Sequence, residues 1–218
     1  MKKVLHFLRS RRNDLIFYAV FLFILICVRS SVFASYHVPT GSMNPTILEG
    51  DFFFTNKLAY RLKVPLTKTS VVEWSLPSRG ELVIFKFPDN ERELYTKRVI
   101  GLPGDVVQLR GGNLYVNGEK KTGGMTGKKG GKTFFRETLG DEEYTIQHIN
   151  GMSYMTDTPP VKVPEGHIFV MGDNRDNSYD SRAWGCLPLD NVEGRMFIRW
   201  FSFDRSRMRP RLERIGLI

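Results

Sequence analysis

Residues 81–105 read ELVIFKFPDNERELYTKRVIGLPGD, and two short apolar runs within them indicate the fold of the chain. The runs extend from Glu81 to Phe87 and from Tyr95 to Ile100, and polar or turn-forming residues bound both of them. Runs of this length with such boundaries are typical of β-strands. The second run leads into Pro103-Gly104-Asp105, which predicts a tight turn.

The rest of the chain beyond residue 36 has the same pattern of short apolar runs separated by turn residues. Because no window has a long amphipathic helical period, we predict a mostly β domain with an antiparallel sheet. A second tight turn is predicted at Asn117-Gly118. Residues 118–133, GEKKTGGMTGKKGGKT, are rich in glycine and lysine, so we expect a flexible excursion that buries nothing. The other predicted strands are Val106 to Leu109, Leu114 to Val116, His167 to Met171 and Met196 to Phe201.

Composition limits the class of protein. With 218 residues, of which 41% are hydrophobic, the chain has room for one globular domain with an appendage. The net charge of +9 is concentrated at the two ends, and no nucleic-acid recognition motif accompanies it, so we expect no nucleic-acid partner. The two cysteines, Cys27 and Cys186, lie far apart with no zinc-ligand spacing, which predicts neither a disulfide nor a metal site.

An uncharged apolar segment, LIFYAVFLFILICV, extends from Leu15 to Val28, and the apolar character resumes after Arg29 through Ala34. Its 14 residues rise only about 21 Å as a helix, whereas about 20 residues span a hydrocarbon core. Two interpretations stay open: a transmembrane anchor over residues 15–34 with Arg29 reaching the interface, or a cleaved secretory signal. In both, the basic residues 1–14 stay in the cytoplasm and the chain after residue 35 crosses the membrane.

Several common catalytic and nucleotide-binding motifs are absent. Gly131-Lys132-Thr133 resembles the end of a P-loop, but Thr126 stands where the loop needs its first glycine, so we expect no nucleotide. Lys121-Thr122-Gly123 resembles part of the penicillin-binding motif set, but no serine has a lysine three residues later. The chain also lacks a GxSxG elbow and an HExxH zinc motif.

The stretch HVPTGSMNPT, residues 37–46, contains a candidate nucleophile, Ser42. A serine hydroxyl needs a neighbouring base. His6, on the cytoplasmic side, is excluded, and no companion carboxylate at a suggestive spacing marks the other histidines as that base; these are His37, His148 and His167. Lys97 is the alternative, because alternation on a strand places it on the face opposite Arg98 among apolar residues, and burial can keep a lysine neutral.

Four segments, in this order, resemble the motifs of the bacterial type I signal peptidases. PTGSMNPT resembles the nucleophile box, RGELVIFKFP at residues 79–88 the strand that follows, YTKRVIGLPGD the lysine box, and GDNRDNSYDSRAWG at residues 172–185 the last box. The resemblance covers residues 36–109 and 161–203. It implies an antiparallel β-sheet catalytic domain over residues 35–218, with a variable insertion at residues 118–160.

The resemblance also implies roles for individual residues. Ser42 would be the nucleophile and Lys97 the general base, and the Thr40 hydroxyl and the Ser42 backbone N–H would bind the oxyanion. Ser178 would orient the Lys97 amine, while Asp180 and Arg182 would form a supporting ion pair. Shallow pockets for small substrate residues would be lined by Tyr36, Val38, Met43, Ile47 and Thr96.

By the same resemblance, the substrates are the signal peptides of exported preproteins, and no cofactor is needed. The anchor is then retained, and the protein is a single-pass protein of the cell inner membrane with a cytoplasmic N-terminus and a periplasmic catalytic domain. Membrane lipid would contact an apolar surface of Trp200 and Phe201 or of Phe52 to Phe54. The alternatives are a specialised processing peptidase of the conjugation-pilin or mitochondrial inner-membrane type, or a non-catalytic membrane-anchored β scaffold.

Overall fold

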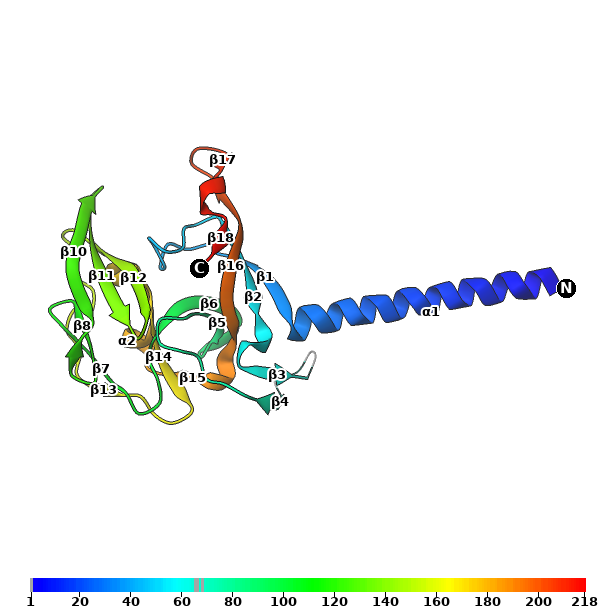
Figure 1. Ribbon diagram of the computed structural model, residues 1–218, viewed down its shortest axis with the longest axis horizontal. Helices are drawn as coiled ribbons and strands as arrows, with labels where there is room; N and C mark the ends of the chain where they lie inside the picture. Colours follow the sequence, from blue (N-terminus) through cyan, green and yellow to red (C-terminus); the bar gives the residue numbers. More distant parts are fainter. Residues whose placement is uncertain (1, 65–66, 68) are drawn as a thin grey trace.

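The computed structural model describes residues 2–64, 67 and 69–218, with side chains from residue 14 onward. Helix α1 (Lys2–Ser31) projects from the β domain (Figure 1). Its segment Asp14–Ser31 is long and apolar enough to cross a membrane, with a mean hydropathy of 2.0. The helix ends three residues before the predicted end of the anchor, because Phe33 and Ala34 lie in strand β1 (Phe33–His37).

The predicted mostly β, antiparallel fold is confirmed by the central sheet, in which every described pairing between neighbouring strands is antiparallel. The strands predicted within residues 81–105 are two neighbours in its middle, joined by a turn at Pro88 and Asp89. The order of the sheet is β1, β2 (Asp51–Asn56), β16 (Val192–Asp204), β5 (Leu82–Phe87), β6 (Asn90–Gly101), β14 (His167–Met171) and β15 (Leu187–Pro188), and β17 (Arg209–Pro210) and β18 (Gly216–Leu217) also pair with β16.

Two smaller sheets lie at the end of the domain opposite α1 (Figure 1). A separate two-stranded hairpin, β3 and β4, pairs with neither small sheet and lies near the end of α1. The first small sheet has the order β10 (Thr122–Lys129), β11 (Lys132–Leu139), β12 (Glu142–Ile149); the second has the order β13 (Val161–Lys162), β7 (Val106–Arg110), β8 (Asn113–Val116), β9 (Glu119–Lys120); the hairpin is β3 (Arg61–Lys63) and β4 (Ser70–Glu73). The short helices are α2 (Ser181–Trp184), η1 (Lys57–Ala59), η2 (Arg175–Asn177), η3 (Leu189–Asn191) and η4 (Leu212–Arg214).

The prediction that residues 118–133 form a flexible excursion is wrong. They form β9, β10 and the start of β11, and Gly130 and Gly131 make the turn between β10 and β11 with φ of 57° and 71°. Positive φ at both positions is what such a turn requires of its residues. Thr122 is buried, and its hydroxyl donates to a Glu137 carboxylate oxygen at 2.7 Å. The glycines therefore serve a hairpin, and the segment does bury a side chain.

Strand β5 is buried on both faces, which explains its uninterrupted apolar run. Val83 and Phe85 pack into one apolar cluster, whereas Leu82 and Ile84 pack into another. Successive side chains on a strand point to opposite faces, so both faces of β5 are covered. The Leu82 and Ile84 cluster also contains Val38, Met43 and Ile47, which hold the loop between β1 and β2 against the sheet.

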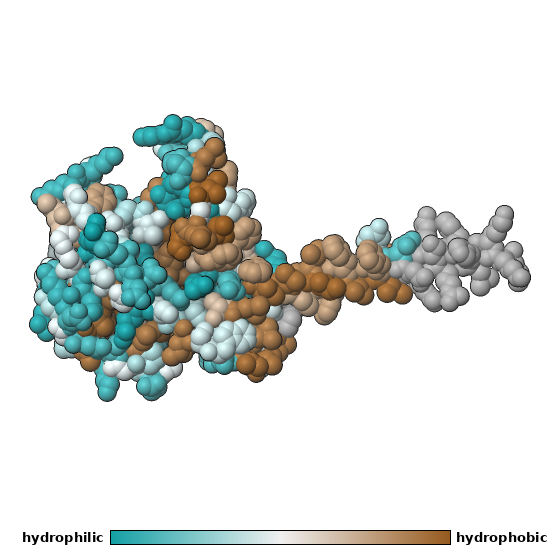
Figure 2. Space-filling model, in the orientation of Figure 1, coloured by the Kyte–Doolittle hydropathy of each residue, from teal (hydrophilic) through white to brown (hydrophobic). Residues whose placement is uncertain are grey.

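Aromatic side chains gather on β2 and β16, where the sequence predicted a membrane-facing surface. The Phe54 and Trp200 rings stack with centroids 5.6 Å apart, and both side chains are about 40% exposed. Phe52 packs against both Trp200 and Phe201. Figure 2 shows apolar surface over this part of the domain and along α1.

Candidate active site

The candidate nucleophile lies in the loop between β1 and β2, where local contacts fix the backbone. Asn44 N–H donates to the Gly41 carbonyl at 3.1 Å, and Ile47 N–H donates to the Met43 carbonyl at 3.0 Å. The Met43 and Ile47 side chains are almost fully buried beneath the loop. Ser42, between these anchors, remains half-buried. The loop therefore holds the Ser42 hydroxyl in a defined place at the surface of the core.

Lys97 on β6 contacts this serine, with Lys97 Nζ and Ser42 Oγ 2.6 Å apart. The lysine side chain is only 3% exposed, and this burial lowers its pKa from 10.5 to about 8. The Asp180 carboxylate acts in the opposite direction and raises the pKa. Arg98, the next residue, points away and bonds to Asp173, so the two cations separate onto opposite faces as alternation predicts.

The described histidines have partners other than Ser42. His37 packs on the Phe52 ring, with centroids 5.0 Å apart. His148 Nδ1 lies 3.1 Å from an Asp176 carboxylate oxygen, and His167 Nδ1 lies 3.0 Å from the Glu165 carbonyl. The side chain of His6 lies outside the described residues.

A loop at residues 172–174 holds the backbone on both sides of the Ser42 nitrogen, and sequence reasoning assigned it no role. Asn174 is buried, its N–H donates to the Ser42 carbonyl at 3.1 Å, and its side-chain amide donates to the Gly41 carbonyl at 2.9 Å. Gly172 allows the close approach, since a Cβ there would lie 2.2 Å from Ser178 Oγ and 2.5 Å from the Ser42 carbonyl oxygen. The predicted last box, residues 172–185, was the only sequence signal for this loop.

The other residues predicted from that box lie directly behind the dyad. Ser178 is buried beside Gly172, and its hydroxyl has no hydrogen-bond partner in the described part of the chain. Asp180 and Arg182 form a buried bidentate ion pair, with Arg182 Nε and Nη2 donating to the carboxylate at 2.8 and 2.9 Å. Asp180 also accepts the Gly172 N–H at 3.0 Å, so the ion pair is connected to the loop that holds Ser42.

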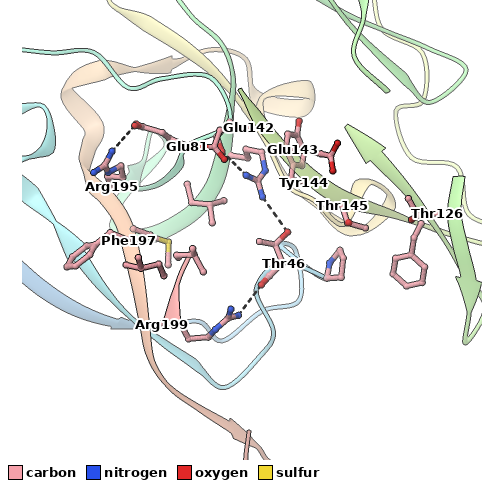
Figure 3. A pocket seen from close by; sticks show the side chains of 18 of the residues that line it. Thr46, Glu81, Thr126, Glu142, Glu143, Tyr144, Thr145, Arg195, Phe197 and Arg199 are labelled. Carbon is pink, nitrogen blue, oxygen red and sulfur yellow. Dashed lines mark hydrogen bonds and ion pairs between the residues drawn. The ribbon is translucent and has the colours of Figure 1, made fainter. Parts of the chain in front are cut away.

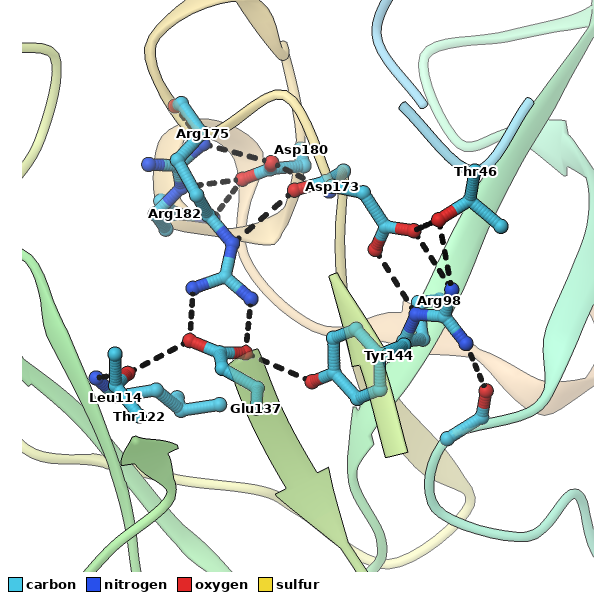
Figure 4. Close-up of polar contacts among 12 residues, drawn as sticks. Thr46, Arg98, Leu114, Thr122, Glu137, Tyr144, Asp173, Arg175, Asp180 and Arg182 are labelled. Carbon is cyan, nitrogen blue, oxygen red and sulfur yellow. Dashed lines mark hydrogen bonds and ion pairs between the residues drawn. The ribbon is translucent and has the colours of Figure 1, made fainter. Parts of the chain in front are cut away.

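Two further buried ion pairs join this region to the strands around it (Figure 4). Arg98 donates to Asp173 through Nε at 2.9 Å and Nη2 at 2.6 Å, and the Thr46 hydroxyl donates to the same carboxylate. Asp173 thereby ties β6 to the nucleophile loop. Arg175 and Glu137 form the second pair, in which both side chains are fully buried.

Glu137 has two further donors besides Arg175. The Tyr144 hydroxyl donates to one carboxylate oxygen at 2.8 Å, and the Thr122 hydroxyl donates to the other. Burial raises the pKa of Glu137. The charge and hydrogen bonds of Arg175, together with the hydrogen bonds from Thr122 and Tyr144, outweigh this effect and lower the pKa. The three-stranded sheet is therefore joined to η2 by a carboxylate that is ionised at neutral pH.

A cleft of about 570 Å³ opens at Ser42 and Lys97. Of the predicted wall residues, it is lined by Tyr36, Val38, Met43 and Thr96, and exposed Thr40 lies at it too. Ile47 does not line the cleft, because it is fully buried in the apolar cluster below the loop. Sequence reasoning did not predict Leu94 and Tyr179, which extend the apolar wall.

A larger cavity of about 840 Å³ lies on the other side of the nucleophile loop, between β16 and β12 (Figure 3). Thr46 and Arg98 are among its lining residues, but neither Ser42 nor Lys97 is. The Ser42–Lys97 pair therefore lies outside this cavity. Within the described residues, no group of three His, Cys, Asp or Glu side chains is arranged to hold a metal ion.

Comparison with known proteins identifies the family. A solved signal peptidase I from Enterococcus faecalis is 29% identical, with a TM-score of 0.36 over 56% of this chain and 97% of that one. Signal peptidase I of Pseudomonas aeruginosa is 37% identical over 214 residues, 90% of this chain and 75% of that protein. The Rickettsia conorii protein of the same name is 35% identical over 207 residues, 85% of this chain and 77% of that protein. Residues 11–201 match the model of the family described as signal peptidase, peptidase S26. The chain therefore belongs to the signal peptidase family, peptidase S26.

Proposed function

We propose that this membrane-anchored serine endopeptidase removes signal peptides from exported preproteins, with Ser42 as nucleophile and Lys97 as general base. The observation on which the proposal rests is the 2.6 Å contact between Ser42 Oγ and the buried Nζ of Lys97. A lysine acts as a base only when its amine is neutral, and burial favours the neutral form. The pKa of Lys97, lowered to about 8, meets that requirement.

The chemistry follows from this pair. Lys97 Nζ takes the Ser42 proton as Oγ attacks the carbonyl carbon of the scissile peptide bond. The Ser42 N–H and the Thr40 hydroxyl donate to the oxyanion that forms. The Lys97 ammonium then protonates the departing amine, and the acyl-enzyme is hydrolysed by water with Lys97 again as base. We propose that the Ser178 hydroxyl, which has no partner among the described residues, turns toward the Lys97 amine during the reaction and orients it, and that the Asp180–Arg182 pair supports the site.

The cleft supports cleavage after small residues. Val38 and Met43 are buried in its wall, and Tyr36 and Thr96 are half-buried, so this part of the cleft beside Ser42 is apolar. We expect this apolar wall to take alanine next to the cut and to disfavour Leu or Phe there. We assign the cleft to the residues that precede the cut.

The topology follows from charge. The basic residues 1–14 stay in the cytoplasm, residues 15–31 span the inner membrane as part of α1, and residues 35–218 face the periplasm. The retained anchor keeps the cleft at the membrane surface, where signal peptides and lipid are its partners. Neither a nucleotide nor a nucleic acid takes part.

The test is cleavage of a preprotein by the full-length protein in detergent, followed by mass spectrometry of both products. We expect one cut after a small residue, and no cut with Ser42→Ala. Ser206→Ala is the matched control, because within the described residues the Ser206 hydroxyl bonds only to nearby Asp204, on an exposed turn. Cleavage by folded Ser42→Ala at the wild-type rate would refute the assignment of the nucleophile.

A further inference from the structure

The cleft at Ser42 and Lys97 has one carboxylate among its lining residues within the described part of the chain, and it belongs to Glu93. Glu93 is exposed, and an exposed carboxylate carries a negative charge at neutral pH. Most of the remaining wall is uncharged, because it consists of aliphatic, aromatic and hydroxyl side chains. The cleft therefore contains an acidic group to which the proposed dyad assigns no role.

Glu93 lies on the face of β6 that carries the proposed base. Lys97 Nζ lies 5.7 Å from the centroid of the Tyr95 ring, and the Tyr95 hydroxyl donates to a Glu93 carboxylate oxygen at 3.4 Å. These contacts agree with the rule that alternate residues of a strand share a face. Each residue advances a strand by about 3.3 Å, so Glu93 lies about 13 Å along β6 from Lys97.

The Glu93 carboxylate is held in place but is not neutralised. The Asn90 side-chain amide donates to its other oxygen at 2.8 Å. Asn90 and Tyr95 are neutral donors, and an ionised carboxylate has about four acceptor sites, so some of them remain open. None of the ion pairs between described residues includes Glu93. A cation at this end of the cleft would therefore meet a carboxylate that has no counter-charge.

A substrate chain that lies along β6 passes this carboxylate. On one edge of β6, β5 pairs with residues 94–98, whereas on the other edge the pairing with β14 begins at Arg98. Among the described strands, none pairs with that second edge at residues 94–97, so an extended peptide can lie along it. With the residue before the cut at Ser42, and about 3.3 Å for each further residue, the peptide comes level with Glu93 near the fifth residue before the cut.

We propose that Glu93 determines specificity by favouring signal peptides that carry a lysine or arginine near the fifth residue before the cut and disfavouring those with an acidic residue there. The proposal rests on the proposed function, because it uses the assignment of the cleft to the residues that precede the cut. It adds a preference for charge to the expected preference for small residues. Exposed ion pairs are weak and are screened by salt, so the preference is modest and depends on ionic strength.

Preproteins that differ in one residue test this assignment. Lys, Ala or Glu is placed in turn at the fourth, fifth and sixth residue before the cut, and kcat/KM is measured with the full-length protein in a non-ionic detergent at low salt. The pH is kept well above the ordinary histidine pKa, so that His37 at the cleft is neutral. At one or more of these positions the Lys substrate should be cleaved roughly threefold to tenfold faster than the Glu substrate, and added salt should reduce this ratio.

Variants assign the effect to one side chain. Glu93→Gln should bring the ratio of the Lys to the Glu substrate close to one, and Glu93→Lys should invert it. Glu91→Gln is the matched control, because it removes the same charge two residues away on the same strand, and Glu91 lines a different cavity. The control should keep the wild-type ratio. Each readout compares two substrates of one enzyme, so a smaller folded fraction of a variant leaves it unchanged.

The other outcomes overturn the proposal. A wild-type ratio near one at all three positions, or a ratio that Glu93→Gln leaves unchanged, shows that this carboxylate does not read the substrate. An equal loss of the ratio in Glu91→Gln shows a general effect of net charge. Cleavage of the Ala substrate separates the two levels of inference. If the wild type does not cleave it, the proposed function fails, whereas cleavage without a charge preference overturns only the role of Glu93.

Discussion

The pKa of Lys97 sets the pH range in which the proposed dyad works. Burial lowers this pKa from 10.5 to about 8. At pH 7 the neutral fraction of the amine is then about one tenth, against about 3 in 10,000 for an unshifted lysine, a gain of roughly 300-fold. Because only the neutral amine accepts the Ser42 proton, kcat/KM should rise about tenfold from pH 7 to pH 9 and then level off.

The assay is the initial rate of preprotein cleavage by the full-length protein, measured from about pH 6 to about pH 10 at low substrate concentration, so that the profile reports the free enzyme. A variant with His37, His148 and His167 all changed to Gln should show the same rise of kcat/KM with pH. Lys97→Arg should be inactive at every pH, because a guanidinium does not lose its proton. Two results would refute the reasoning. One is a rise of kcat/KM centred near the ordinary histidine pKa that disappears in the triple variant, and the other is cleavage by folded Lys97→Ala.

Three further predictions concern the buried groups. Lys97→Met should be inactive, but at neutral pH its free energy of unfolding should exceed that of the wild type by as much as about 3 kcal/mol. The reason is that keeping the buried amine protonated costs about 1.4 kcal/mol for each unit by which its pKa is lowered. Denaturant unfolding should show this difference shrinking from pH 8 to 10.5, because the native wild-type lysine is neutral in that range. Asn174→Ala should lower kcat about tenfold with little change in KM, through loss of its bond to Gly41; an unchanged kcat would show that the loop does not position Ser42. Glu137→Gln should cost about 3 to 5 kcal/mol of unfolding free energy because Arg175 loses its buried counter-charge, and a melting temperature equal to wild type would contradict this.

Local sequence patterns predicted the parts of the fold that local interactions determine. The apolar runs around Val83 and Val99 became β5 and β6, and alternation correctly separated Lys97 from Arg98. The error at residues 118–133 has a physical cause. Composition indicated that the segment could not build a core of its own, but strands at an edge need only backbone partners, and the partners are the neighbouring strands β8 and β11.

The long-range contacts behind the site could not be predicted from one sequence. Asn174 reaches Gly41 across 133 positions, and Arg175 reaches Glu137 across 38. No periodicity links such residues, because their proximity depends on how the sheets pack. Ile47 illustrates the same limit within a motif. Its position near Ser42 suggested the cleft wall, but only the folded loop reveals that its side chain turns into the core.

The ion pair behind the dyad resolves a conflict in the electrostatics of Lys97. A carboxylate close to a buried amine favours the ammonium, and Asp180 does raise the pKa of Lys97, against the effect of burial. Arg182 lowers that pKa, and its guanidinium holds the Asp180 carboxylate at 2.8 and 2.9 Å. Burial is the largest of these effects on the pKa of Lys97, and Arg182 offsets the opposing effect of the Asp180 charge. Asp180 is needed in turn because it accepts the Gly172 N–H and so fixes the loop that positions Ser42. The Asp180–Arg182 pair thus helps to position Ser42, and because Arg182 offsets the Asp180 charge, the pair does not hold Lys97 in its protonated form.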